Sequence, residues 1–189
     1  MTDRDDSPVD ELFGEPEASD APVARNALAL WAAERLRAES PSPALRQRLL
    51  RTIEGPDRFL PFVSTICRIF DLTAGEALRD LLGRIDEASG WLYHGQARYF
   101  HFTPGPALAG LEAGVVRMAR GVVFPRHLHR RGEITLVLEG IMQDRGCSYG
   151  PGAVIESEPG TSHDYRAGGT GRDLVLLSRH GGIEFLPES

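Results

Sequence analysis

The stretch GVVFPRHLHRRGEITLVLEG, residues 121–140, is the most informative part of this chain. His127 and His129 are two residues apart, so on a β-strand both imidazoles project from the same face. Residues 130–132 can form a turn that brings the carboxylate of Glu133 back toward that face. Two neutral imidazoles and a carboxylate suit a divalent ion such as Zn, Fe, Mn, Ni or Co.

A third histidine, His163, lies in GPGAVIESEPGTSHDY, residues 150–165. Gly and Pro mark turns at 150–152 and 159–160, with a short strand between them. His163 is expected to begin the next strand, and a neighbouring strand of the same sheet can place its imidazole beside the other groups. The sequence therefore predicts one metal site, made by His127, His129, Glu133 and His163.

The second half of the chain has the pattern of an all-β fold. After Gly90, short runs rich in β-branched and aromatic residues alternate with Gly and Pro clusters, which is typical of a sandwich or barrel. The expected strands include residues 97–102, 114–118, 134–140, 153–157 and 173–178.

Residues 22 to about 88 have the apolar spacing of three or four amphipathic helices. Ser42 followed by Pro43 predicts a helix start, and Gly55–Pro56 predicts its end. A third helix is expected to start near Asp57 with Pro61 in its first turn. Thr73 with Glu76 predicts a capping box for a fourth. The four apolar stripes are Leu28, Trp31, Ala32 and Leu36; Leu45, Leu49 and Ile53; Phe59, Val63, Ile66 and Phe70; and Leu78, Leu81, Leu82 and Ile85.

These stripes are expected to pack on each other or on the β domain, although a small bundle often leaves one apolar face for another chain. Residues 1–21 are acidic and rich in Pro and Ser, and we expect a disordered tail there. A second interpretation of the tail is a short docking segment at Val9, Leu12 and Phe13.

The formal net charge of −6 argues against direct nucleic-acid binding, which needs a basic surface. Cys67 and Cys147 form no disulfide framework, so a reducing cytoplasm is the expected compartment. The first residues have neither a basic start nor an apolar segment, and no apolar run approaches the length of a membrane span. We therefore expect a cytoplasmic protein that does not associate with membranes.

The two histidine-containing stretches resemble the motifs of the cupin superfamily. The first motif is matched at every fixed position, by Gly121, His127, His129, Glu133 and Gly140. The second is matched by Gly152, Gly160 and His163, but Glu158 stands where the family has Pro. The resemblance covers about residues 91–186 and implies a jelly-roll β-barrel with the metal inside, held by three His and one Glu. Some cupins keep the fold without the metal.

The stretch from 132 to 185 resembles, more narrowly, the C-terminal cupin of ChrR-type anti-sigma factors. In that family a helical N-terminal domain binds an extracytoplasmic-function sigma factor, and a zinc-binding cupin follows it. The resemblance implies zinc as the metal, a sigma factor as partner of residues 22–88, and a small molecule as ligand of the barrel. The family's N-terminal zinc motif is missing, since residues 1–90 contain no His and Cys67 is their one Cys.

The predicted architecture is mainly β, with a helical bundle ahead of a jelly-roll barrel. Three hypotheses for function stay open: a regulatory protein that senses a small molecule or oxidant, a metal-dependent enzyme of the dioxygenase or isomerase type, and a ligand-binding cupin whose helices form a homodimer.

Tyr165 is expected to share the face of His163. Three other histidines lack the spacing of ligands and are expected on the surface or in strands: His94, His101 and His180.

Overall fold

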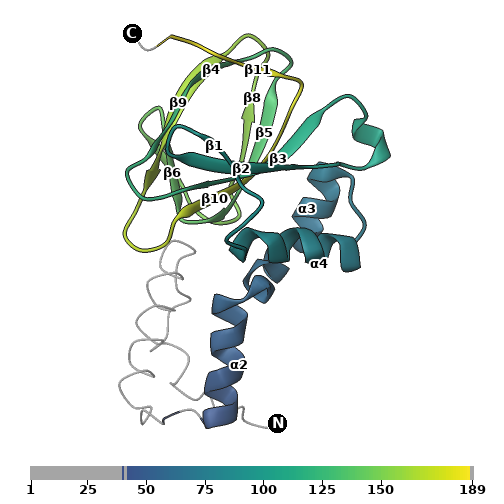
Figure 1. The fold of residues 1–189 in the computed structure, drawn as a ribbon, viewed down its shortest axis with the longest axis vertical. Coiled ribbons are helices and arrows are strands. Elements are labelled where there is room, and N and C mark those ends of the chain that lie inside the picture. The colour runs from purple at the N-terminus through teal and green to yellow at the C-terminus, as the bar shows by residue number, and fades with distance from the viewer. Residues whose placement is uncertain (1–39, 41, 188–189) are drawn as a thin grey trace, which may run out of the picture. The chain divides into compact units, whose positions relative to one another are not determined.

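The computed structural model describes residues 40 and 42–187 (Figure 1). The chain divides into two compact units, residues 1–45 and 46–189. The acidic tail and the first predicted helix lie outside the described residues, so both stay predictions, as do the boundaries at 22–88 and 91–186.

Helix α2 spans Pro43–Glu54 and confirms both predicted ends. Ser42 Oγ accepts a hydrogen bond of 3.2 Å from the backbone N–H of Leu45, as an N-cap does. The apolar stripe of α2 is not buried as expected, because Leu49 and Ile53 are 50% and 52% exposed. This helix therefore presents apolar side chains for which the described residues provide no cover.

The third helix begins later than the sequence predicts. Residues Pro56–Phe62 form a 3₁₀ helix, η1, and α-helix α3 spans Val63–Phe70. Pro61 has no N–H to donate, so it is accommodated in η1 and the α-helix starts after it. The predicted apolar face is largely confirmed, because Phe59, Ile66 and Phe70 are buried.

The fourth helix, α4, spans Glu76–Gly83 and continues into a short 3₁₀ helix, η2, at Arg84–Asp86. The predicted capping box is wrong, because Gly75 is the N-cap and no side chain caps the helix. Thr73 lies two residues too early for its hydroxyl to reach the free N–H groups of the first turn. The predicted apolar face is confirmed: Leu78, Leu81, Leu82 and Ile85 are buried.

Two antiparallel sheets form the rest of the described chain, which confirms the mainly β prediction. The first sheet has the order β1-β2-β3-β10-β5-β8 and the second the order β11-β4-β9-β6-β7. A short 3₁₀ helix, η3 (Pro106–Leu108), connects β2 to β3. The strands are β1 (Leu92–His94), β2 (Ala97–Phe102), β3 (Glu112–Met118), β4 (Val123–His129), β5 (Glu133–Glu139), β6 (Ile141–Asp144), β7 (Cys147–Tyr149), β8 (Val154–Ser157), β9 (Ser162–Gly168), β10 (Leu174–His180) and β11 (Ile183–Phe185).

The six-stranded sheet is buried on both faces, which explains the unbroken apolar run of β5. Leu136 and Leu138 point to one side and pack with Phe59, Ile66 and the other buried residues of η1 to η2. Val137 points to the other side, into a second cluster between the sheets that includes Met142. A strand covered on both sides loses the alternation of polar and apolar residues. The helices and the barrel thus share one hydrophobic core.

Polar side chains continue the inward-facing rows of these strands. On β5, Glu133 and Thr135 share the face of Val137, and on β10, Ser178 and His180 share the face of Leu176. Within the described residues no helix is long and apolar enough to cross a membrane. The barrel interior therefore has an apolar part and a polar part, and the predicted ligands lie in the polar part.

Candidate metal centre

Pairing of β4 with β9 brings the three predicted histidine ligands together, and Glu133 joins them from the other sheet. His127 of β4 lies opposite His163 of β9 in the antiparallel register, and His129 lies two residues further on the same face of β4. Glu133 is the first residue of β5, in the other sheet. The turn before it requires glycine, since Gly132 has φ +85° and a Cβ there would meet Ser157 O at 2.9 Å.

The three imidazoles form a nearly equilateral triangle. Their ring centroids lie 4.9, 4.7 and 4.8 Å apart for the pairs His127–His129, His127–His163 and His129–His163. Glu133 Oε2 lies 3.2 Å from His129 Nε2 and 3.8 Å from the Nε2 atoms of His127 and His163. All three histidines are buried, with exposed fractions of 1%, 0% and 4% in sequence order.

The other ring nitrogen of each histidine is held by a group that accepts a hydrogen bond. Nδ1 of His127 lies 2.9 Å from the carbonyl oxygen of Pro125, and Nδ1 of His163 lies 2.7 Å from Asp144 Oδ2. Nδ1 of His129 lies 3.0 Å from Thr161 Oγ1, whose own proton is donated to the carbonyl of Glu158. Each Nδ1 must therefore carry the proton, so each Nε2 presents a lone pair to the centre of the triangle.

This arrangement fits one divalent ion. The four candidate ligand atoms lie within 4.8 Å of one another, slightly more than the roughly 4.4 Å that two atoms at about 2.2 Å from one ion can span, so a small inward shift of the side chains brings all four onto one ion. Nε2 of His129 and of His163 are buried and have no hydrogen-bond partner among the described residues. Converging lone pairs beside a buried carboxylate repel each other without a cation, so the donor set matches an ion such as zinc.

The electrostatics of the carboxylate agree with a cation site. Burial acts to raise the pKa of Glu133, but hydrogen bonds that the three imidazoles donate from Nε2 when no ion occupies the centre, together with the one from the Ser178 hydroxyl, outweigh burial and hold the pKa well below its ordinary value. Ser178 donates a hydrogen bond to Glu133 Oε1, which leaves Oε2 facing the imidazoles. Glu133 is therefore an anion with one oxygen directed at the centre.

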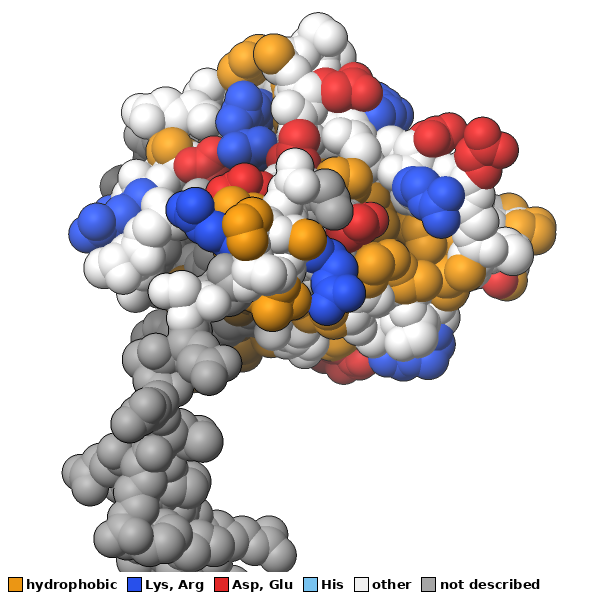
Figure 2. All heavy atoms as spheres, turned by 90° about the horizontal axis from the view of Figure 1, so that it is seen from below, with side chains coloured by type: hydrophobic (Ala, Val, Ile, Leu, Met, Phe, Trp, Pro, Cys, Tyr) orange, Lys and Arg blue, Asp and Glu red, His pale blue; other side chains and the backbone are white. Residues whose placement is uncertain are grey.

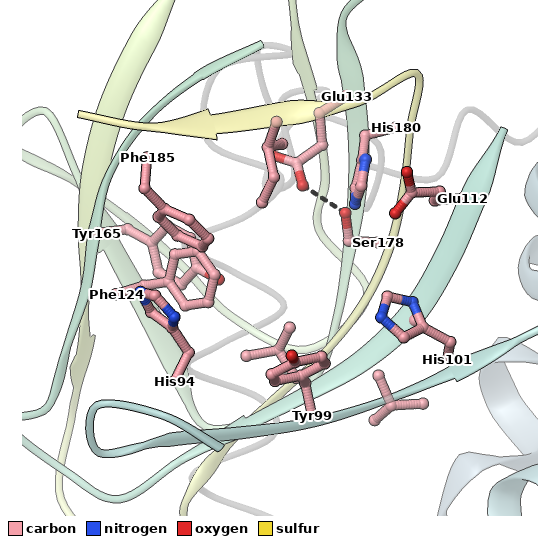
Figure 3. Close-up of a pocket in the computed structure, with 14 residues that line it drawn as sticks. His94, Tyr99, His101, Glu112, Phe124, Glu133, Tyr165, Ser178, His180 and Phe185 are labelled. Carbon is pink, nitrogen blue, oxygen red and sulfur yellow. Dashed lines mark hydrogen bonds between the residues drawn. The ribbon is translucent and has the colours of Figure 1, made fainter. Parts of the chain in front are cut away.

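A cavity of about 210 Å³ opens beside Glu133 (Figure 3). His94, His101 and His180 lie on β1, β2 and β10 and outside the cluster of candidate ligands, as expected, and all three line this cavity. The prediction for Tyr165 is confirmed, because it is buried, lines the cavity and stacks on Phe124 with ring centroids 4.9 Å apart. All six histidines of the chain thus lie in the cluster of candidate ligands or around this cavity.

Sequence reasoning missed the residues that hold the ligands. Asp144, Thr161 and Ser178 are far from their histidine or glutamate partners along the chain, and no spacing rule connects them. Cys67 is half-buried and packs against the core of the helices, and Cys147 is exposed on β7. Neither cysteine belongs to the cluster of candidate ligands.

Comparison with known families decides the type of barrel. Residues 107–182 match the family described as the ChrR cupin-like domain. These residues form a ChrR-type cupin. Comparison with curated proteins gave no match.

Several solved structures are similar to all or part of this chain. A chain of the crystal structure of Rhodobacter sphaeroides SigE in complex with the anti-sigma ChrR is 22% identical, with 87% of this chain and 80% of that chain covered and a TM-score of 0.49. The polyketide cyclase RemF from Streptomyces resistomycificus is 20% identical over 50% of this chain and 74% of its own, with a TM-score of 0.41. An acetylacetone dioxygenase from Acinetobacter johnsonii is 14% identical over 50% and 66%, with a TM-score of 0.43.

Proposed function

We propose that this protein is a cytoplasmic regulatory protein of the ChrR type. In this proposal the cupin barrel holds one divalent ion, zinc, through His127, His129, Glu133 and His163, and senses a small molecule or an oxidant. The helical region binds a sigma factor and keeps it from RNA polymerase. The observation that carries the proposal is a complete ligand set inside a barrel of the ChrR cupin-like family.

The helical region supports a protein partner through its uncovered apolar surface. Leu45, Leu49 and Ile53 of α2 recur at every fourth residue, so they share one helix face, and all three are exposed. Another exposed apolar side chain, Leu60, is 58% exposed and lies beside a groove between η1 and α4. In Figure 2 hydrophobic side chains gather among charged ones on the lower face. Exposed apolar faces of this kind mark protein interaction sites.

A bridge of charged side chains connects the helices to the strand that carries Glu133. Arg58 of η1 pairs with Asp86 at 2.7 Å and with Glu139 at 3.2 Å. Glu139 is the last residue of β5, and Glu133 is the first. Arg172 also pairs with Glu139 at 2.7 Å. A change at the metal can therefore reach the helices through one rigid strand and its terminal ion pairs.

The experiment is a binding measurement with the metal-loaded full chain and candidate extracytoplasmic-function sigma factors. We expect a specific complex. The double variant Leu49→Asp, Ile53→Asp should weaken it at least tenfold, because two apolar side chains that the partner would bury become charged. The matched control is Val154→Asp, an exposed apolar residue of β8 outside the helical region. No binding to any such sigma factor, or equal loss in the control, would contradict the proposal.

An enzyme is the second candidate, and the cavity beside Glu133 is the observation that favours it. When bound, the divalent ion supplies a Lewis acid, which supports dioxygenase or isomerase chemistry on a substrate in that cavity. Turnover of a diketone or catechol that disappears in Glu133→Gln would favour this function. A metal-loaded chain without turnover that still binds a sigma factor would leave regulation as the sole function.

A further inference from the structure

We propose that the cavity beside Glu133 binds a small planar ligand with an oxygen acceptor, and that His180 recognises this oxygen as a hydrogen-bond donor of fixed tautomer. The inference rests on the proposed function, because the metal must hold Glu133 and its barrel in place. It adds the chemical class of the ligand and the residue that selects it.

Aromatic side chains form one wall of the cavity. Phe124 stacks on Tyr165 with ring planes 4° apart, and Phe185 lies 5.9 Å from Phe124. His94 stacks on Phe185 at 4.0 Å with ring planes 12° apart, so it extends the same wall. Figure 3 shows these rings together on one side of the cavity. Such a wall favours a flat ligand that can stack on it.

Polar side chains form the opposite wall. Figure 3 shows Ser178, His180 and Glu112 across from the aromatic rings. Their positions follow from strand register, since His180 of β10 lies opposite Glu112 of β3 and opposite Glu133 of β5. The cavity thus has a polar side that continues from the metal centre.

The tautomer of His180 is the reverse of that of the three ligand histidines. The backbone N–H of Gly182 donates a hydrogen bond of 3.2 Å to His180 Nδ1, so Nδ1 carries the lone pair. The neutral ring then carries its proton on Nε2. No protein group among the described residues is bonded to Nε2, so its N–H is free for a ligand.

Two of the remaining groups bear on an oxygen acceptor in the ligand, whereas Glu112, on the same polar wall, is itself an acceptor. Tyr165 lines the cavity, and its hydroxyl is bonded to no other described residue, so it can donate a second hydrogen bond. The proton of Ser178 is already used by Glu133. Two N–H or O–H donors and a divalent ion all require oxygen or another electron-rich atom on the ligand.

The size of the cavity limits the ligand to about one ring. Pockets for drug-sized ligands measure roughly 300–1,000 Å³. The volume of about 210 Å³ here is smaller, so a single ring with one carboxylate, hydroxyl or carbonyl group fits the class. Glu133 lines this cavity, whereas the three ligand histidines do not, so such a ligand meets the metal centre on the side of its carboxylate.

The test is calorimetric titration of the zinc-loaded full chain with three probes. Benzoate has both the ring and the oxygens, toluene has the ring alone, and acetate has the carboxylate alone. We expect benzoate to bind at least about tenfold more tightly than either of the others. Similar affinities for the three probes, or no binding of benzoate at millimolar concentration, would overturn the inference.

Variants test whether His180 is the residue that recognises the oxygen of the ligand. His180→Phe keeps a ring but removes the donor, and we expect it to lose about tenfold in benzoate affinity, the usual effect of one hydrogen bond, with toluene unchanged. His180→Gln restores an N–H near the position of Nε2 and should recover most of the affinity. Tyr93→Phe, which removes a hydroxyl donor from an exposed ring that does not line the cavity, is the matched control and should bind benzoate normally. An unchanged affinity in His180→Phe would overturn the role of His180.

Zinc content is measured on the same samples, so the two ideas can fail separately. A chain without zinc at the four ligands would contradict the proposed function and this inference together. A zinc-loaded chain that does not discriminate among the probes would contradict this inference alone.

Discussion

At the residue scale, Asp144 matters because it fixes the tautomer of His163. Asp144→Asn keeps the size of the side chain but can turn its N–H₂ group toward Nδ1, which would favour the wrong tautomer. We expect metal affinity to fall by about 10- to 100-fold, as for other such partners of metal-binding histidines. Competition with a chromophoric chelator measures it. Asp164→Asn, at the exposed neighbour of His163, is the control and should leave affinity unchanged.

In the proposed metal site, protonation of His163 competes with the metal. Burial lowers the pKa of this imidazole, but Glu133 and Asp144 outweigh burial and raise it above 6.5. Without metal, the protonated ring stabilises the fold below pH 6.5, and that contribution is lost as pH rises through the raised pKa. The metal needs the neutral ring.

We therefore expect the metal to stabilise the fold least near pH 5 and progressively more as pH rises past 6.5. The measurement is the difference in Tm between metal-loaded and chelator-treated protein at several pH values. A difference that is constant from pH 5 to 8 would contradict the role of His163.

The four residues of the candidate ligand cluster could be selected from the sequence, but most of their surroundings could not. His127, His129 and Glu133 are close along the chain, and the period of a strand places the two histidines on one face. Asp144 reaches His163 only because β6 pairs with β9. His180 reaches the cavity through the register of β10 against β3 and β5, which no local pattern encodes.

At the scale of elements, β5 carries both the core and the site. Leu136 is fully buried in the core shared with the helices, so Leu136→Ala is expected to cost about 2–5 kcal/mol of unfolding free energy. Chemical denaturation measures this cost. Val154→Ala on β8, a change at a side chain 39% exposed, should cost well under half as much. Equal losses would mean that the helices do not pack on β5.

Element bounds were predicted best where cap or turn residues mark them, as at both ends of α2 and of β2. β2 has the bounds that its sequence predicts, because turn residues flank it on both sides. Helix α3 starts at Val63, after a 3₁₀ segment that holds Pro61, because that proline cannot join an α-helical hydrogen-bond ladder. Thr73→Ala should therefore change stability by less than about 0.5 kcal/mol, since this residue caps nothing. If Thr73→Ala lowers the free energy of unfolding by 1 kcal/mol or more in chemical denaturation, Thr73 does cap the helix and our interpretation is wrong.

At the scale of the whole molecule, the helices of residues 56–86 and the barrel share one core, and a single ion is expected inside the barrel. A ligand that binds the folded state alone stabilises it by about 4 kcal/mol at a thousandfold excess over its Kd. Removing the metal should therefore weaken the barrel and, through the shared core and the Arg58 bridge, the helices as well.

The metal content of the purified full chain tests this account most directly. Elemental analysis should find one divalent ion per chain, and this ion should be lost in Glu133→Gln and in His163→Ala while circular dichroism retains the β signal. His101→Ala, at an exposed histidine outside the ligand set, should keep the ion. A chain that carries no ion after expression in metal-replete medium, or that keeps it in both ligand variants, would contradict the assignment of these four residues.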